Sequence, residues 1–216
     1  MKIGVLGTGM VGNAISTKLA QLGHQVRMGS RTADNPKASD WVKANGAKAS
    51  HGTFADSAAY GEILFNCTAG TASLEALTLA GANNLRGKIL IDIANPLDFS
   101  KGIPPTLSVC NTDSLGEQIQ LAFPETKVVK TLNTVNCNVM VKPSLVPGDH
   151  DMFICGNDSA AKARVTDILK NWFGWKSVFD LGDITGARAM EMFLPIWLRL
   201  MMKFQTPSFN VKIVKA

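Results

Sequence analysis

The stretch "KIGVLGTGMVGNAISTKLAQLGHQVRMGSRT", residues 2–32, decides how the chain folds. A short apolar run leads into Gly7, Gly9 and Gly12, spaced G-x-G-x-x-G, and is followed by a helical pattern and a second apolar run. A strand, a glycine turn, a helix and a strand within about 30 residues are typical of a unit that binds a dinucleotide. Gly7 allows the tight turn, Gly9 lets the backbone approach a pyrophosphate, and Gly12 lets the helix pack closely on the strand.

The end of the second apolar run indicates which dinucleotide is bound. A free ribose 2'-hydroxyl usually meets an Asp or Glu there, whereas a 2'-phosphate needs cationic and hydroxyl donors. The chain instead continues with Ser30, Arg31 and Thr32, with Lys37 nearby and no acid before Asp34. These side chains can donate charge-assisted hydrogen bonds to a phosphate. The sequence therefore predicts NADP(H) as the cofactor, with the 2'-phosphate at Ser30 and Arg31.

Length, charge and cysteine content limit the remaining possibilities. The 216 residues are enough for one large domain or for a domain with a small appendage. The net charge is +5, but the Lys and Arg residues are scattered, which favours a phosphorylated small ligand over nucleic acid. The apolar stretch 190–204 is interrupted by charges and falls short of the ~20 residues needed to cross a bilayer. The four cysteines form no C-x-x-C pair, so we expect a cytoplasmic protein with no metal site.

Apolar runs alternate with helical patterns along the whole chain, which predicts an α/β fold. We expect a Rossmann-type, doubly wound and mostly parallel sheet in which "GEILFNCT" (61–68) and "KILIDIAN" (88–95) are central strands. Two prolines and a glycine within 141–151 place a boundary near residue 145. Residues 1–145 would then form the NADP-binding domain and 146–216 a small C-terminal α/β lobe, unless the two make one continuous domain.

The periodicity also gives approximate bounds for each element. Strands are expected at 2–7, 25–29, 46–50, 62–68, 88–93, 127–132, 151–155, 177–181 and 208–214. Helices are expected at 10–22, 38–45, 53–60, 72–81, 114–122, 159–172 and 185–204. The last helix is apolar on nearly every side and must therefore be buried. It could lie in the core, in a dimer interface, or along a pocket for a planar substrate, since its methionines adapt to irregular shapes.

Five segments together resemble the NADPH-dependent reductases of the deazaflavin coenzyme F420. They are "IGVLGTGMVGNAISTKLAQLGHQVRMGSR" (3–31), "KILIDIANPL" (88–97), "VVKTLNTVN" (128–136), "FICGND" (153–158) and "GARAMEMFLPIWLRLM" (186–201). Many dehydrogenases share the glycine pattern, whereas "GSR" and the later motifs are more specific. The resemblance implies a Rossmann domain with a small C-terminal lobe, usually a homodimer, that transfers a hydride between NADP(H) and a deazaflavin.

The resemblance also implies positions for the ligands. The pyrophosphate turn of the family falls on residues 7–12, including Thr8, Met10 and Val11, and its 2'-phosphate clamp falls on Ser30 and Arg31. Two later loops, "CTAGT" (67–71) and "ANPL" (94–97), fall where the nicotinamide and the acceptor ring meet. The residues expected to contact the cofactor or the substrate in these loops are Thr68, Ala69, Gly70, Asn95 and Pro96.

One departure from the family affects the acceptor. Deazaflavin-reducing members tend to have a His where this chain has Asn133. Asn133 and Asn136 can hydrogen-bond a deazaflavin, a flavin or a smaller carbonyl compound, so either F420 or a flavin can be the co-substrate. Hydride transfer between stacked rings needs orientation and exclusion of water rather than a nucleophile or a metal.

Two other functions compete with this interpretation. The first is an NADPH-dependent reductase of a small imine or carbonyl compound, but such enzymes carry a long helical domain after the Rossmann unit, and the segment after residue 150 is too short for it. The second is a non-catalytic NADP(H)-binding module, because binding and turnover use the same glycine turn.

Overall fold

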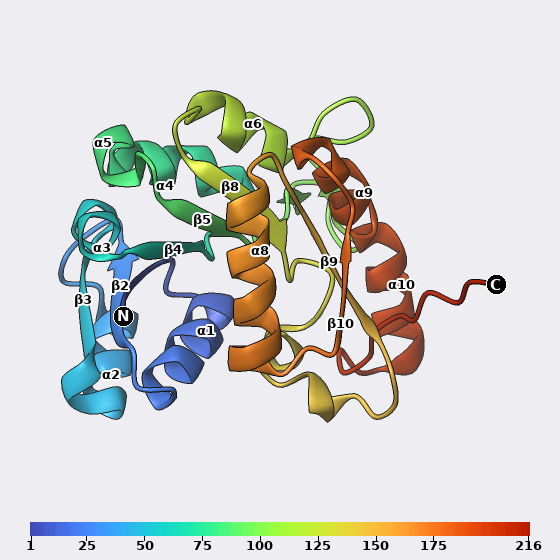
Figure 1. Cartoon of the computed structure of the whole chain (residues 1–216), viewed down its shortest axis with the longest axis horizontal. Helices are drawn as coiled ribbons and strands as arrows, with labels where there is room; N and C mark the ends of the chain where they lie inside the picture. Colours follow the sequence, from blue (N-terminus) through green and yellow to red (C-terminus); the bar gives the residue numbers. More distant parts are fainter.

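The computed structural model describes all 216 residues and is built around one eight-stranded sheet (Figure 1). The strand order is β10-β9-β8-β5-β4-β1-β2-β3, and all neighbours are parallel except β8 and β9. This arrangement confirms the predicted α/β fold. The strands are β1 (Lys2–Leu6), β2 (Gln25–Ser30), β3 (Ala49–Thr53), β4 (Ile63–Asn66), β5 (Ile89–Asp92), β8 (Lys127–Thr131), β9 (Asp151–Gly156) and β10 (Ser177–Asp180).

Helices cover both faces of the sheet (Figure 1). One hydrophobic cluster includes side chains of α1, α2, α7 and α8, and a second includes side chains of α3, α4, α5, α6 and α9. Because β4 and β5 lie between these two layers, almost all of their residues are buried, as their continuous apolar runs predict. The helices are α1 (Met10–Gln21), α2 (Pro36–Asn45), α3 (Phe54–Tyr60), α4 (Ser73–Ala80), α5 (Ala82–Leu85), α6 (Leu115–Ala122), α7 (Cys137–Val141), α8 (Ser159–Asp167), α9 (Ala187–Met192) and α10 (Leu194–Phe204).

The strand order reverses between β1 and β4. The chain runs outward from β1 through β2 to β3, then returns to the other side of β1 to form β4 and β5. Loops that leave the carboxyl ends of β1 and β4 therefore diverge and open a crevice, which is where open α/β sheets bind their ligands. Both the glycine turn and the loop 67–71 begin at this edge.

The C-terminal part of the chain extends the same sheet. β9 pairs with β8, and β10 pairs with β9. Met152, Ile154 and Phe173 belong to the same hydrophobic cluster as Ile3 and Val5 of β1. The division at residue 145 stays a prediction. A separate hairpin of β6 (Leu97–Asp98) and β7 (Thr106–Leu107) lies outside the main sheet and was not expected.

Several of the expected elements differ in detail. The third strand begins at Ala49 rather than 46, because Gly46, at φ +69°, starts a 3-10 turn that ends α2. The expected helix 159–172 is α8 followed by a π-helical turn, Ile168–Phe173. The expected strand 208–214 has no ladder; one backbone bond runs from Asp151 N–H to Val211 O, while Ile213 N–H donates to the Asp151 carboxylate instead of a neighbouring strand.

The expected helix 185–204 is two helices. α9 ends before Phe193, and Pro195 lies in the first turn of α10, where its missing N–H is tolerated but a continuous helix would clash. Within the single chain, only Leu194 of α10 is buried, so α10 does not lie in the core, and its burial in a dimer interface stays a prediction. Ile196 and Phe204 of α10 are more than half exposed.

Candidate functional site

The glycine turn has the geometry that its spacing predicts. Gly7 has φ +119°, and a Cβ there would lie 2.5 Å from the carbonyl oxygen of Cys67. A Cβ on Gly12 would lie 2.1 Å from the carbonyl oxygen of Gly7. Only glycine fits at these two positions. At Gly9, by contrast, a Cβ would meet no atom within 4 Å, so the backbone there borders open space.

The N-terminus of α1 is free to receive an anion. Its N-cap residue, Gly9, provides no side-chain cap, and the first turn contains no acidic residue. The first N–H groups of a helix have no partner within the helix and carry the positive end of its dipole. The turn can therefore accept a pyrophosphate along Thr8, Gly9, Met10 and Val11, so these residues fit the predicted dinucleotide.

The end of β2 places a cation beside a carboxylate. Ser30 is buried at the end of the strand, and its hydroxyl donates to the carbonyl oxygen of Thr32. The Arg31 guanidinium lies 3.3 Å from Glu75 Oε2, with side chains 63% and 61% exposed. Glu75 is in the first turn of α4, 44 residues away in sequence, and was not anticipated. Arg31 is thus accessible to a 2'-phosphate, which would have to compete with Glu75.

Lys37 lies in surroundings that differ from those of the Arg31–Glu75 pair. It lies in the first turn of α2 and lines a wide groove of about 1130 Å³ between α1, α2 and α7. Thr8, Gly9 and Met10 form one end of that groove. Arg31 and Thr32 line neither this groove nor the cavity described next. Lys37 thus shares a groove with Thr8, Gly9 and Met10, whereas Arg31 does not line it.

A cavity of about 330 Å³, here termed the ring cavity, opens beside the start of α1. It is mostly apolar and brings together five segments that are far apart in the sequence. Its lining residues are Met10, Val11, Cys67, Thr68, Ala69, Gly70, Ile93, Ala94, Asn95, Leu97, Phe99, Asn133, Val135, Asn136, Cys137, Met140, Leu194 and Trp197. The predicted residues of the loops after β4, β5 and β8 thus lie on one cavity, Pro96 excepted.

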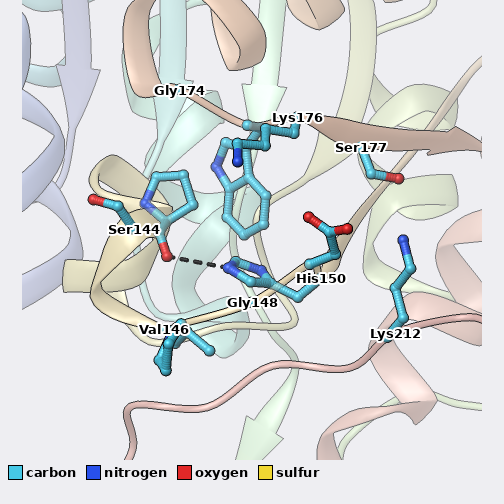
Figure 2. A pocket seen from close by; sticks show the side chains of 12 residues that line it. Ser144, Val146, Gly148, His150, Gly174, Lys176, Ser177 and Lys212 are labelled. Atoms are coloured by element: carbon cyan, nitrogen blue, oxygen red, sulfur yellow. Dashed lines mark hydrogen bonds between the residues drawn. The ribbon is translucent and has the colours of Figure 1, made fainter.

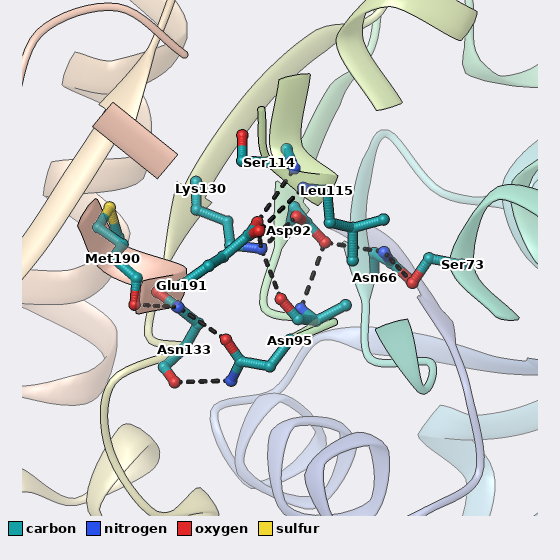
Figure 3. A network of polar contacts seen from close by, with 12 residues as sticks. Asn66, Ser73, Asp92, Asn95, Ser114, Leu115, Lys130, Asn133, Met190 and Glu191 are labelled. Atoms are coloured by element: carbon teal, nitrogen blue, oxygen red, sulfur yellow. Dashed lines mark hydrogen bonds and ion pairs between the residues drawn. The ribbon is translucent and has the colours of Figure 1, made fainter. Parts of the chain in front are cut away.

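The loops after β5 and β8 are fastened to each other by two amides (Figure 3). Asn95 Nδ2 donates to the carbonyl oxygen of Asn133 at 2.8 Å, and Asn133 Nδ2 donates to Asn95 Oδ1 at 2.9 Å. The side chain of Asn95 is therefore engaged in the protein. Asn136 caps α7 by accepting from the Asn138 N–H, and a Cβ on Gly70 would lie 2.1 Å from Asn95 O, so these loops are closely packed.

A buried ion cluster lies next to the loops after β5 and β8 (Figure 3). The Lys130 ammonium is fully buried and lies 2.8 Å from both Asp92 Oδ2 and Glu191 Oε1. It also donates to the carbonyl oxygen of Ala94, a residue of the ring cavity. Burial alone would lower the pKa of Lys130, but the two carboxylates outweigh it and raise that pKa above its ordinary value. We call Asp92, Lys130 and Glu191 the buried triad.

Both carboxylates of the buried triad have further donors. Asp92 Oδ1 accepts from Asn66 Nδ2 at 2.8 Å, and Asn66 Oδ1 accepts from the Thr68 hydroxyl at 2.7 Å. Glu191 accepts from the N–H groups of Leu115 and Gly116 at the start of α6. The triad therefore connects α9, α6 and the loops after β4 and β5 into one polar network.

The buried triad was not predicted, although each member gives a signal in the sequence. Asp92 and Lys130 interrupt apolar runs that are expected to be central strands, and Glu191 interrupts the apolar helix. Charged side chains in such elements are almost never fully buried unless they are paired. That rule indicates that partners exist, but the sequence does not say that the three pair with one another.

A second cavity, of about 370 Å³, lies near the start of β10 and has a polar lining (Figure 2). It contains none of the predicted site residues. His150 Nε2 lies 3.1 Å from the carbonyl oxygen of Pro143, and Nδ1 lies 3.0 Å from Asn210 Nδ2, so both ring nitrogens are engaged.

No helix in the structure is both long enough and apolar enough to span a membrane.

Comparison with known proteins indicates the same cofactor as the geometry of the glycine turn, an NADP-type dinucleotide. The family profile described as NADP oxidoreductase, coenzyme F420-dependent, matches residues 2–96. A crystal structure from Arthrobacter sp. FB24, provisionally assigned as an F420-dependent NADP reductase, is 53% identical to this chain, covers 100% of both chains and superposes with a TM-score of 0.94. The F420-dependent NADP reductase of Methanocaldococcus jannaschii is 28% identical over 99% of this chain and 98% of its own length.

A more distant likeness concerns the fold alone. A reductive aminase from Aspergillus terreus, solved with NADPH4, cyclohexanone and allyl amine, is 18% identical and has a TM-score of 0.66. The likeness covers 94% of this chain but 62% of the aminase.

Proposed function

Because this chain belongs to the coenzyme F420-dependent NADP oxidoreductase family, and is thus an NADP-dependent oxidoreductase, we propose that it transfers a hydride between NADP(H) and a deazaflavin of the F420 type. A flavin is the second choice of acceptor, since the two ring systems have the same shape. The family assignment favours an enzyme over a non-catalytic NADP(H)-binding module.

The lining of the ring cavity supports this proposal most strongly. It includes no Asp, Glu, His, Lys, Arg or Tyr side chain. Its only titratable groups are the thiols of Cys67 and Cys137, and burial raises the pKa of both, so they stay protonated at neutral pH. Reduction of a ketone needs a proton donor beside the oxygen. A deazaflavin or flavin ring delocalises the charge it gains, which suits a cavity without an acid.

The positions of the predicted residues permit roles for several of them. The free N–H groups from Gly9 to Val11 would hold the pyrophosphate, and Arg31 would hold the 2'-phosphate, joined by Ser30 once its hydroxyl leaves the Thr32 carbonyl oxygen. When bound, NADP(H) supplies or receives the hydride. The loops after β4 and β5, with Gly70 packed against Asn95, would orient the nicotinamide, and the apolar side chains of Leu97, Phe99 and Trp197 in the lining would help to exclude water from the bound rings.

The experiment measures NADPH oxidation at the dihydronicotinamide absorbance band with purified protein. F420, FMN, riboflavin, and cyclohexanone with an amine are supplied in turn. We expect oxidation with F420, a lower rate with the flavins and none with the ketone and amine. Turnover with the ketone and amine alone would instead support the imine or carbonyl reductase interpretation.

Gly9 offers a matched control for this assay. Because a Cβ at Gly9 meets no atom within 4 Å and the residue is extended at φ −76° and ψ −172°, Gly9→Val is expected to fold normally. The added side chain would occupy the space next to the pyrophosphate. The variant should keep its thermal stability and lose NADPH oxidation, and unchanged oxidation would contradict the placement of the cofactor.

Exposed apolar side chains on α10 support a second part of the proposal, a homodimer. Ile196, Met202 and Phe204 are 54%, 44% and 52% exposed on one short helix. Apolar side chains gathered in this way mark an interaction surface. Sedimentation analysis should give twice the mass of the chain for the wild type, and a monomer for Ile196→Glu.

The cytoplasmic location stays a prediction.

A further inference from the structure

Phe99 lies at the mouth of the ring cavity, where the cavity meets solvent. It lines the cavity and is 59% exposed, so a ligand can reach its ring without any rearrangement of the protein. Of the large apolar side chains in the lining, only Phe99 and Met10 are exposed, and Met10 belongs to the glycine turn. Exposed apolar side chains that gather at a cavity indicate a contact surface.

Two turns hold the backbone of Phe99 in place. On one side, the Asp98 carboxylate accepts from the Ser100 N–H at 2.8 Å and from the Ser100 hydroxyl at 2.9 Å. On the other side, the Gly102 N–H donates to the carbonyl oxygen of Phe99 at 3.0 Å. The aromatic ring is therefore presented from a fixed backbone. A group that is positioned in advance loses less conformational freedom when a ligand binds.

The β6–β7 hairpin that carries Phe99 is joined directly to the inner wall of the cavity. The Leu97 N–H donates to the carbonyl oxygen of Asn95 at 2.8 Å, and the Ser108 N–H donates to that of Pro96 at 2.8 Å. Asn95 itself lines the cavity. These bonds fix the base of the hairpin, and so the position of Phe99, relative to the inner wall.

The size of the ring cavity determines where an acceptor ring lies. Its volume of about 330 Å³ is at the lower end of the range of about 300–1,000 Å³ that is typical for a single drug-sized ligand. Hydride transfer needs the nicotinamide and the acceptor ring stacked on each other. A nicotinamide beside Asn95 leaves too little enclosed space for three fused rings. The acceptor ring must then extend to the mouth of the cavity, with its outer face toward the exposed side chains.

We infer that Phe99 is a specificity-determining residue that stacks on the outer face of the acceptor ring, while the inner face meets the nicotinamide. This inference rests on the proposed function and states how the site selects its substrate class. Aromatic rings attract one another beyond the effect of the area that they bury. A small ketone offers no ring face, so Phe99 favours flat heteroaromatic acceptors over small carbonyl compounds.

The test is calorimetric titration of 5-deazariboflavin into protein saturated with NADP⁺, a mixture that cannot react because both ligands are oxidised. Phe99→Ala should bind the ring about tenfold more weakly than the wild type, and Phe99→Tyr, which keeps an aromatic ring, should bind it normally. Ile103→Ala is the matched control, because Ile103 is 82% exposed in the same hairpin loop and does not line the cavity.

The outcomes separate the inference from the proposed function. Equal affinities of the wild type and Phe99→Ala would overturn the inference and leave the proposed function standing. Failure of the wild type to bind 5-deazariboflavin would overturn both.

Two further measurements on Phe99→Ala test other roles for this side chain. Because Phe99 is exposed, thermal stability, NADPH affinity and the sedimentation coefficient should stay unchanged. A loss of NADPH affinity would mean that Phe99 contacts the nicotinamide, and a shift from dimer to monomer would mean that it lies between two copies of the chain. Either result would overturn the inference.

Steady-state kinetics give an independent readout. With NADPH and 5-deazariboflavin, Phe99→Ala should raise KM for the acceptor about tenfold with a smaller effect on kcat, since stacking holds the ring in the ground state and the transition state alike. An unchanged KM would contradict the role given to Phe99.

Discussion

Two groups of opposite charges in this chain differ in their access to water. Arg31 and Glu75 lie 3.3 Å apart with both side chains more than half exposed. In the buried triad, Lys130 lies 2.8 Å from each carboxylate and no member is exposed by more than 1%. An exposed pair contributes little to stability and separates easily, whereas a buried charge that loses its partner is strongly destabilising.

The difference indicates a division of work between the two regions. Under the proposed function, Arg31 would exchange Glu75 for the 2'-phosphate of the cofactor, because this replaces one exposed anion with another. Lys130 cannot leave its carboxylates, and through its bond to the Ala94 carbonyl it fixes the wall of the ring cavity. We therefore propose that the exposed pair binds the ligand phosphate and that the buried triad positions the cavity wall.

The largest effect is expected from removing the ammonium of the buried triad. Lys130→Met would leave Asp92 and Glu191 buried without their shared cation, which should reduce the free energy of unfolding by about 3–5 kcal/mol. Denaturant unfolding followed by circular dichroism measures this. Arg86→Met, which breaks an exposed pair with Glu125, is the control and should cost less than about 1 kcal/mol. Similar losses in the free energy of unfolding for the two variants would contradict the distinction between buried and exposed charges.

Alkaline pH should weaken the buried triad without a substitution. The pKa of Lys130 is raised in the folded protein, so its contribution is fully present below the unfolded-state pKa of about 10.4 and is lost as pH rises through the folded-state value. The free energy of unfolding should therefore fall above that unfolded-state value. The fall should be smaller in Lys130→Met. Equal falls in both proteins would contradict the role given to Lys130.

At the exposed pair, the expected effect is on cofactor choice rather than on stability. Arg31→Ala should weaken NADPH binding roughly tenfold, because one charge-assisted bond to the 2'-phosphate is lost, and leave NADH binding unchanged. Fluorescence titration with the two dinucleotides measures the ratio. Arg27→Ala, on β2 four residues before Arg31 and packed over Tyr60, serves as the control. An unchanged NADPH preference in Arg31→Ala would refute the 2'-phosphate site.

The smallest effect is expected from Glu75. Glu75→Gln removes the anion that competes for Arg31, so NADPH should bind a few-fold more tightly, while stability changes by less than about 1 kcal/mol. The same titration and unfolding experiments apply. Weaker NADPH binding by this variant would mean that Glu75 assists the ligand instead of competing with the phosphate.

The two regions also differ in how far the sequence predicted them. The glycine turn and Ser30–Arg31 follow from local spacing, because a strand, a turn and a helix are fixed by neighbouring residues. The central strands were predicted for the same reason. Glu75 was missed, since its contact with Arg31 depends on how α4 packs. The buried triad was missed because its members come from three elements that meet only in the folded sheet.

The C-terminal helix shows a further limit of the periodicity argument. An apolar pattern predicted burial for the whole of 185–204, yet only the first part packs in the core. The apolar pattern predicts that these side chains are shielded from water, but it does not identify which part of the molecule, or which partner, shields them. In α10, Leu194 and Trp197 face the ring cavity while Ile196 and Phe204 stay exposed.

The most direct test of the account is a crystal structure of the protein with bound NADP⁺. We predict that the pyrophosphate lies on the N–H groups from Gly9 to Val11, that the Arg31 guanidinium has left Glu75 for the 2'-phosphate, and that the nicotinamide enters the ring cavity beside Asn95. A complex in which Arg31 still pairs with Glu75 and the 2'-phosphate points into solvent would contradict it.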